Sequence, residues 1–204
     1  MNEYSTYCGR NEDLQDKELL NLFLAGNNSV YSTIYNKYVD VLFAYGMGLG
    51  VERELLKDAI QDVFYKLYFN RNVLKNVANL KYYLFRMLKN RLLDLRKSSV
   101  DTCEITGCDF SFSIKATILD ELIQEEDCLI IQQRVESLLS CLTARQREAI
   151  YLRFIQELEY EEIACLLNMS SQAVRKLVCR AMERMREQDV LLYFLLFYTT
   201  RFYS

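Results

Sequence analysis

Four polar side chains lie close together at the start of a helix that the sequence predicts near its end: Ser171, Gln172, Arg175 and Lys176. Arginine can donate two hydrogen bonds to a guanine and glutamine can bond an adenine at two atoms, and each such pair contributes about 1–3 kcal/mol of discrimination between bases. Arg180 and Arg184, further along, suit contacts with DNA phosphates. These residue types at this spacing predict a helix that reads a short DNA sequence in the major groove.

The neighbouring residues predict the elements that hold this helix in place. Ser170 can cap its start, and its other side carries apolar residues at helical spacing, as a packed face requires. These residues are Val174, Leu177, Val178, Ala181 and Met185. A short helix is expected over residues 160–167, with Ile163, Ala164 and Leu167 at inward spacing, and Asn168 and Met169 make the turn after it. Thr143 with Gln146 has the form of a capping box that starts an earlier helix. The last two helices form a helix-turn-helix, a motif that docks on DNA.

A second predicted helix, over residues 79–97, carries a basic face. Its apolar side consists of Leu80, Leu84, Met87, Leu88 and Leu95. Its other side carries Tyr82, Arg86, Lys89, Arg96 and Lys97. A solvated helix face is the simpler interpretation of such a pattern, but a helix-turn-helix in the same chain favours a second contact with DNA.

Composition bounds the fold class and the kind of partner. The chain has 204 residues, 51% of them hydrophobic, with no proline and only six glycines, which favours an all-α protein. The net charge of −3 hides a strong asymmetry, because residues 81–97 and 170–186 are basic and residues 98–128 are acidic. Seven irregularly spaced cysteines and no histidine indicate a reducing cytoplasm and predict neither a disulfide framework nor a metal centre. The polar N-terminus lacks the apolar core of a signal peptide.

The pattern predicts two helical domains joined by an acidic linker. Helices are expected over residues 16–25, 29–45, 52–69, 79–97 and 128–141, in addition to those around the helix-turn-helix. The predicted divisions are a helical bundle over 12–98, the acidic linker over 99–127, a helix-turn-helix domain over 128–188 and an apolar tail over 189–204.

The tail contains an apolar run from Val190 to Tyr198 that is too short to span a bilayer, which needs about twenty residues. One interpretation is that the last helix continues and packs this run on the second domain. The other is a docking site for a partner or a second copy of the chain, because a free apolar patch of that size is uncommon on a soluble monomer.

Taken together, these segments resemble the extracytoplasmic-function (ECF) sigma factors, the small two-domain branch of the bacterial sigma-70 superfamily. The resemblance covers residues 16–97 and 142–187. In the first part it rests on KDAIQDVFYKLY and NLKYYLFRMLKNRLLDLRKS, and in the second on LTARQREAIYLRFIQELEYEEIACLLNMSSQAVRKLVCRAMERMRE. The order of these motifs around an acidic linker is more specific than a helix-turn-helix alone.

The resemblance implies a role for each matching residue. The surface that docks on the clamp helices of the largest subunit of core RNA polymerase is matched by Asp58, Gln61, Asp62 and Lys66. The helix that engages the minus-10 promoter element is matched by Tyr82, Arg86, Lys89, Asn90 and Arg96. The adjoining loop that receives a flipped base is matched by residues 70–76, including Asn70, Arg71 and Asn72. The helix that reads the minus-35 element is matched by Ser171, Gln172, Arg175, Lys176 and Arg180.

The same resemblance implies no cofactor and no catalytic residue, and it implies restraint by an anti-sigma factor, which in this family is often membrane-bound. Two other functions are compatible with the residues. One is a free-standing helix-turn-helix regulator with a helical N-terminal sensor or dimerisation domain, although such a regulator has no need of a second basic helix. The other is a helical interaction protein that keeps the fold without binding DNA, against which the Arg175–Lys176 pair argues.

Overall fold

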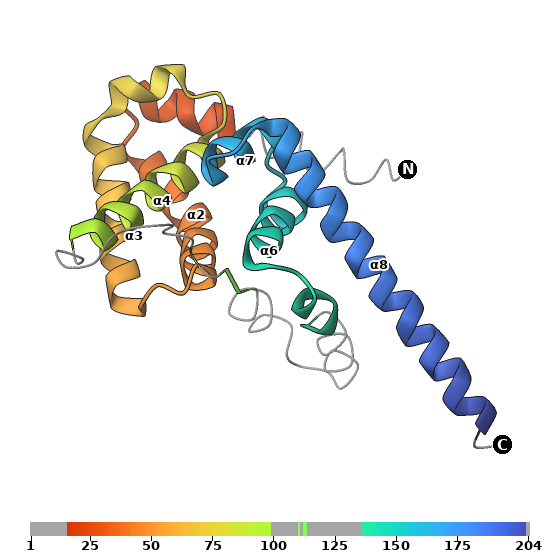
Figure 1. Ribbon diagram of the computed structural model, residues 1–204. Coiled ribbons are helices and arrows are strands. Elements are labelled where there is room, and N and C mark those ends of the chain that lie inside the picture. Colours follow the sequence, from red (N-terminus) through yellow and green to blue (C-terminus); the bar gives the residue numbers. More distant parts are fainter. Residues whose placement is uncertain (1–15, 99–109, 111, 114–135, 203–204) are drawn as a thin grey trace. The chain divides into compact units, whose positions relative to one another are not determined.

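The computed structural model describes residues 16–98, 110, 112–113 and 136–202, and within these ranges all regular structure is helical (Figure 1). Contacts divide the chain into two compact units. The first comprises residues 1–47 and 51–108, and the second comprises residues 48–50 and 109–204. The all-α prediction is therefore confirmed for the described residues.

The described residues of the first unit form four helices and one short 3₁₀-helix. They are a helix over residues 16–24, α2 (Ser29–Gly48), α3 (Arg53–Phe69), η1 (Arg71–Asn76) and α4 (Leu80–Ser98). Helix α3 packs on α4 and buries an apolar stripe at helical spacing. The stripe consists of Leu56, Ala59, Ile60, Val63, Phe64 and Leu67.

Helix α2 runs three residues beyond its predicted end at Tyr45 and includes Gly46. A Cβ atom on Gly46 would lie 2.2 Å from Cδ1 of Leu56, which is itself fully buried. This glycine therefore allows α2 to pack closely against the start of α3, and it does not end the helix. Residues 71–76, expected as an irregular connector, form η1. Leu74, within this segment, is buried and packs in the core.

The second unit contains the helix-turn-helix. After a helical segment over residues 136–140 come α6 (Ala144–Ile150), a π-helical turn labelled η3 (Tyr151–Ile155), α7 (Tyr160–Leu167) and α8 (Ser171–Phe202). The predicted capping box is confirmed. The Gln146 N–H donates to Thr143 Oγ1 at 3.3 Å, and the Thr143 N–H donates to Gln146 Oε1 at 3.0 Å.

One residue of the predicted linker, Phe112, is fully buried in the second unit. Its ring centroid lies 5.2 Å from that of Tyr151, and its carbonyl oxygen accepts a hydrogen bond of 2.9 Å from Nε of Arg147. The linker is therefore attached to the second unit at this point, which the acidic composition of the segment did not indicate.

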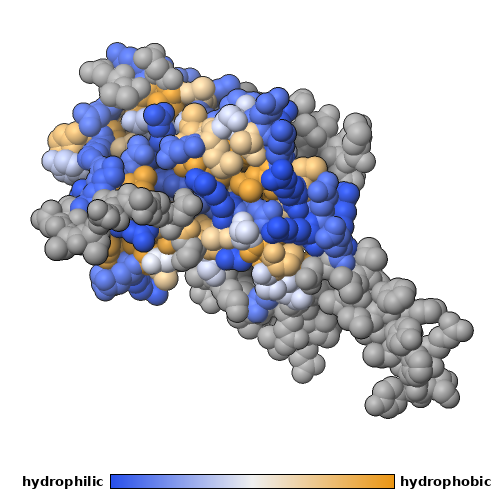
Figure 2. All heavy atoms as spheres, in the orientation of Figure 1, coloured by the Kyte–Doolittle hydropathy of each residue, from blue (hydrophilic) through white to orange (hydrophobic). Residues whose placement is uncertain are grey.

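Helix α8 continues unbroken to Phe202 and extends past α6 and α7 (Figure 1). The backbone of the predicted tail is thus a continuation of the last helix, while the side chains of residues 188–202 lie outside the described set. Within the described part of the chain, no helix is both long and apolar enough to cross a lipid bilayer. Hydrophilic residues cover much of the face shown in Figure 2, with hydrophobic patches between them.

Candidate nucleic-acid interface

The turn between α7 and α8 has the conformation that the motif requires. Asn168 adopts φ 52° and ψ 49°, a left-handed conformation that asparagine tolerates better than most residues. The N–H of Met169 donates to the Ala164 carbonyl at 2.9 Å, and the N–H of Ala173 donates to Ser170 Oγ at 3.2 Å. The turn is therefore closed at both ends by hydrogen bonds, and Ser170 caps α8 as predicted.

Helices α7 and α8 meet through apolar side chains that the sequence pattern had placed on their inner faces. The buried ones are Ile163, Ala164, Leu167, Val174, Val178 and Ala181. This packing turns the opposite side of α8 outward. Gln172, Arg175, Lys176 and Arg180 are exposed there, and Ser171 is half-buried. The structure thus brings all five residues predicted to meet the minus-35 element onto the first three turns of one helix.

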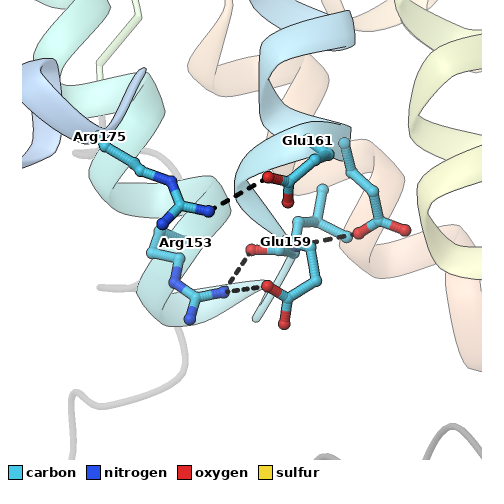
Figure 3. Close-up of polar contacts among 6 residues, drawn as sticks. Arg153, Glu159, Glu161 and Arg175 are labelled. Atoms are coloured by element: carbon cyan, nitrogen blue, oxygen red, sulfur yellow. Dashed lines mark hydrogen bonds and ion pairs between the residues drawn. The ribbon is translucent and has the colours of Figure 1, made fainter. Parts of the chain in front are cut away.

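Arg175 is engaged by residues of α7 that sequence reasoning did not single out. Its Nη2 lies 3.2 Å from Oε1 of Glu161, and its guanidinium carbon lies 4.8 Å from the centre of the Tyr160 ring. Arg153 lies 4.7 Å from the same ring centre, and its Nη1 is 3.4 Å from Oε2 of Glu159. Figure 3 shows the two arginines reaching toward the two glutamates.

The electrostatics of this cluster favour the ionised form of Glu161. Hydrogen bonds from its own backbone N–H and from Arg175 hold the pKa of this carboxyl below its usual range. The sequence contained a partial signal for the cluster, since Tyr160 and Glu161 stand in the first turn of the helix that precedes the reading helix. The fourteen-residue separation of Glu161 from Arg175 hid their contact.

The basic face of α4 differs in one position from the pattern expected of it. Arg86, Asn90 and Arg96 are exposed and Tyr82 is partly exposed, but Lys89 is only 9% exposed. The prediction that Lys89 lies on the solvent side of the helix is therefore wrong. The reason is that Lys89 lies on the same side of the helix as Phe85, four residues before it, and Leu92, three residues after it. Both of these residues are buried, so the buried face of the helix is wide enough to include Lys89.

The segment that was predicted to receive a flipped base begins with a strongly held arginine. The guanidinium of Arg71 lies 4.5 Å from the centre of the Phe23 ring and 4.7 Å from that of Tyr68. Its Nη2 also donates to Oδ1 of Asn28 at 2.6 Å. Asn70 is exposed, and the side chain of Asn72 lies outside the described set. The structure thus places an arginine, stacked on aromatic rings, at the start of η1.

The residues predicted to contact core polymerase lie along α3. Asp58, Gln61 and Lys66 are exposed, whereas Asp62 is ion-paired with Arg91 of α4, with 2.6 Å between Oδ2 and Nη2. A cleft of about 170 Å³ lies between the two helices. Its lining consists of Asp62, Val63, Lys66, Met87, Asn90, Arg91 and Asp94. Residues predicted for polymerase and residues predicted for DNA thus share one cleft.

Comparison with known proteins bears on both parts of the chain. The family model described as "Sigma-70, region 4" matches residues 132–185, which include α6, α7 and the exposed face of α8. The chain is 23% identical over 155 residues to the ECF RNA polymerase sigma factor SigM of Bacillus subtilis (strain 168), covering 75% of this chain and 91% of SigM. It is 24% identical over 172 residues to SigW, an ECF RNA polymerase sigma factor of the same organism, covering 80% of this chain and 90% of SigW.

The chain is similar to ECF sigma factors over most of its length. The matches to SigM and SigW extend beyond the region 4 segment, so this similarity does not depend on the helix-turn-helix alone. The fold agrees with it. The solved structure of CnrH in complex with the cytosolic domain of CnrY matches with a TM-score of 0.51 and 20% identity, covering 85% of this chain and 96% of CnrH.

Proposed function

We propose that this chain acts as an ECF-type sigma factor, which binds core RNA polymerase and directs it to promoters through two DNA contacts, one from each unit. The observation that carries the proposal is the exposed row of Gln172, Arg175 and Lys176 on α8, within the segment that matches sigma-70 region 4. Such a row suits the N-terminal part of a reading helix, which meets base edges in the major groove while its inner face packs on the preceding helix.

For the minus-35 element, the proposal divides α8 into base-reading and phosphate-binding residues. Arg175 and Gln172 carry the donors and acceptors for bidentate contacts with guanine and adenine. Lys176 and Arg180 supply charge that attracts phosphates but carries little sequence information. Losing one of the first pair should change which sequence is bound, and losing one of the second pair should weaken binding to all sequences.

For the minus-10 element, the proposal uses the exposed cations of α4 and the segment over residues 70–76. Arg86 and Arg96 are exposed and can hold the phosphates of the opened strand. An unstacked base recovers part of its unstacking cost when it stacks on aromatic rings or on a guanidinium plane. Arg71, stacked on Phe23 and Tyr68, supports a base-capturing role for this segment.

For core polymerase, the proposal uses the exposed polar face of α3. Asp58, Gln61 and Lys66 recur at intervals of three and five residues and present both signs of charge, which suits a docking surface that depends on electrostatic complementarity. Asp62 joins this surface through its ion pair with Arg91, so that α3 and α4 are held together where polymerase and DNA would meet.

The proposed function includes restraint by an anti-sigma factor that covers polymerase-binding or DNA-binding surfaces, and it would be carried out in the cytoplasm, where core polymerase works. The similarity to ECF sigma factors supports such a partner, and the fold match to CnrH, solved with the cytosolic domain of CnrY bound, is in keeping with it. No catalytic chemistry is assigned to the chain, because sigma factors confer specificity on a polymerase that performs the reaction.

The decisive experiment is transcription by purified bacterial core polymerase, with and without this protein, on a library of genomic fragments. New start sites that share an upstream and a downstream element are expected. If no new start sites arise and the chain never co-purifies with core polymerase, the proposal is wrong. If the chain instead binds specific duplexes without core polymerase, the free-standing regulator is the better description.

Two variants with one matched control separate the proposed surfaces. Asp58→Ala should weaken co-purification with core polymerase, whereas Asp40→Ala, which removes an exposed carboxylate on α2, should not. Arg175→Ala should leave co-purification intact and change the upstream element of the selected promoters. Loss of core binding in the Arg175 variant alone would contradict the assignment of surfaces.

A further inference from the structure

The guanidinium of Arg175 is contacted from the preceding helix by two side chains of different chemistry. Glu161 accepts its hydrogen bond at 3.2 Å, and the Tyr160 ring centre lies 4.8 Å from its guanidinium carbon (Figure 3). Both residues stand in the first turn of α7, and Arg175 stands in the second turn of α8. The contact therefore joins the two helices of the helix-turn-helix at the end that faces DNA in such motifs.

The contact is too exposed to be explained by stability. The side chains of Arg175 and Glu161 are 58% and 64% exposed, and ion pairs of this kind contribute little to folding. What the contact does restrict is the position of a long, flexible side chain with many rotamers. An arginine held in advance loses less conformational entropy when it binds, and its donors already point in fixed directions.

Arg153 also contacts the ring on which Arg175 lies. Its guanidinium carbon lies 4.7 Å from the same Tyr160 ring, its Nη1 donates to the Leu158 carbonyl at 2.8 Å, and it pairs with Glu159. Tyr160 is thus contacted by two cations, which restricts the ring on which Arg175 lies. Glu161 accepts at one nitrogen of a guanidinium that has five donors, so other donors remain for a base edge.

We infer that Tyr160 and Glu161 are positioning residues that set the base preference of Arg175 in the upstream promoter element. Glu161 acts in two ways. It orients the guanidinium for a base edge, and its negative charge beside the reading helix disfavours unspecific capture of phosphates. The inference rests on the proposed function, because it requires that Arg175 meets DNA.

This mechanism predicts changes of opposite sign in two quantities. Without Glu161, Arg175 is free to bond phosphates and other bases, so the preference at the position that Arg175 reads should fall by about fivefold, part of the discrimination that a bidentate contact provides. Affinity for unrelated DNA should rise by about twofold, because one repulsive charge is removed. A merely structural defect would lower both quantities.

The experiment uses the full chain bound to core polymerase and a promoter library that is randomised at the upstream element. The sequences that bind are recovered and compared for wild type, Glu161→Ala, Glu161→Gln, Tyr160→Leu and Tyr160→Phe. Glu161→Gln keeps an acceptor and should retain more base preference than Glu161→Ala. Tyr160→Phe keeps the ring and should behave as wild type, whereas Tyr160→Leu should lose preference.

Controls separate failure of the inference from failure of the proposed function. Arg175→Ala must change the selected element; if it does not, the assignment of Arg175 as a base-reading residue fails. If Arg175→Ala changes the element but Glu161→Ala does not, only the positioning inference is overturned. Glu187→Ala removes an exposed carboxylate more than three turns further along α8 and should leave the preference unchanged.

A double variant gives the sharpest test of action through Arg175. In the Arg175→Ala background, Glu161→Ala should cause no further loss of base preference, because no side chain remains for it to orient. An equal loss with and without Arg175 would show that Glu161 acts independently and would overturn the inference. Thermal unfolding of each variant should remain within a few degrees of wild type, as expected for an exposed pair.

Discussion

Two arginines on α8, Arg180 and Arg184, are one turn apart and both exposed, and we expect them to have different roles. Nη1 of Arg184 donates to Oε1 of Gln146 at 3.0 Å. Gln146 is only 4% exposed, and the same oxygen accepts the Thr143 N–H that completes the capping box of α6. Arg184 therefore links α8 to the start of α6, a contact that its prediction as a phosphate-binding residue did not include. Arg180 lies on the row proposed to face phosphates.

The expected magnitudes differ accordingly. Arg184→Ala removes one hydrogen bond with a charged donor, which contributes about 1 kcal/mol once its exposure is taken into account. The slope of log K against log salt for promoter binding should not change. Arg180→Ala should alter the free energy of unfolding by less than about 0.5 kcal/mol. It should reduce the magnitude of the salt slope by about 0.9, the value expected for one lost phosphate contact.

The assay combines urea denaturation with fluorescence titration of a labelled promoter duplex by the polymerase-bound variants at several salt concentrations. The prediction is a crossed pattern, with stability lost in one variant and salt dependence lost in the other. If Arg184→Ala reduces the slope by as much as Arg180→Ala does, Arg184 contacts phosphate and the division of labour is wrong. If neither variant changes the slope, the proposed DNA-facing row is wrong at Arg180.

Three further predictions concern single positions. Asn168→Gly should keep or raise the free energy of unfolding, whereas Asn168→Ala should lower it by about 1 kcal/mol, because only glycine adopts the left-handed conformation without strain. Equal urea denaturation curves for the two variants would contradict this. Burial raises the pKa of Tyr151 to about 12, so this group stays protonated in the folded chain and ionises near its usual value of 10.0 in the unfolded chain. Between pH 10 and pH 12 the free energy of unfolding of wild type should therefore fall by about 2 kcal/mol more than that of Tyr151→Phe. Denaturation curves at each pH would contradict this if both proteins declined in parallel. Gly46→Ala should destabilise the first unit by about 1 kcal/mol despite the higher helix propensity of alanine, because its Cβ would overlap the buried Leu56 side chain. Thermal unfolding of the double variant with Leu56→Val tests this cause. Partial recovery of stability would support it, and no recovery would contradict it.

Local signals in the sequence predicted the helices and their starts well. The capping box at Thr143 and Gln146, the cap at Ser170 and the left-handed turn at Asn168 depend on residues a few positions apart, so the sequence alone contains what is needed. The apolar faces of α7 and α8 also followed from helical spacing.

Helical spacing did not predict the burial or close packing that depends on a neighbouring helix or segment. Gly46 lies inside a helix because Leu56 approaches it, and Lys89 is buried because Phe85 and Leu92 extend the core beside it. A helical wheel assigns one outward direction to each residue but does not say how wide a face the neighbouring helix covers. The same limit hid the burial of Phe112 against Tyr151.

The charge pattern needs the same correction before it is used to estimate binding to DNA. From the sequence, each cation in residues 81–97 and 170–186 counts equally toward a basic surface. In the structure Lys89 is buried, Arg91 pairs with Asp62, and Arg184 donates to Gln146. These three cations already contribute to the fold, so we expect each of them to add less to phosphate binding than its formal charge suggests. Arg175 differs from them, because its contact with Glu161 lies on the face of the helix-turn-helix that is proposed to meet DNA. The number of phosphate contacts made by the two helices should therefore be smaller than the number of basic residues on them, and the measured salt slope should reflect the smaller number.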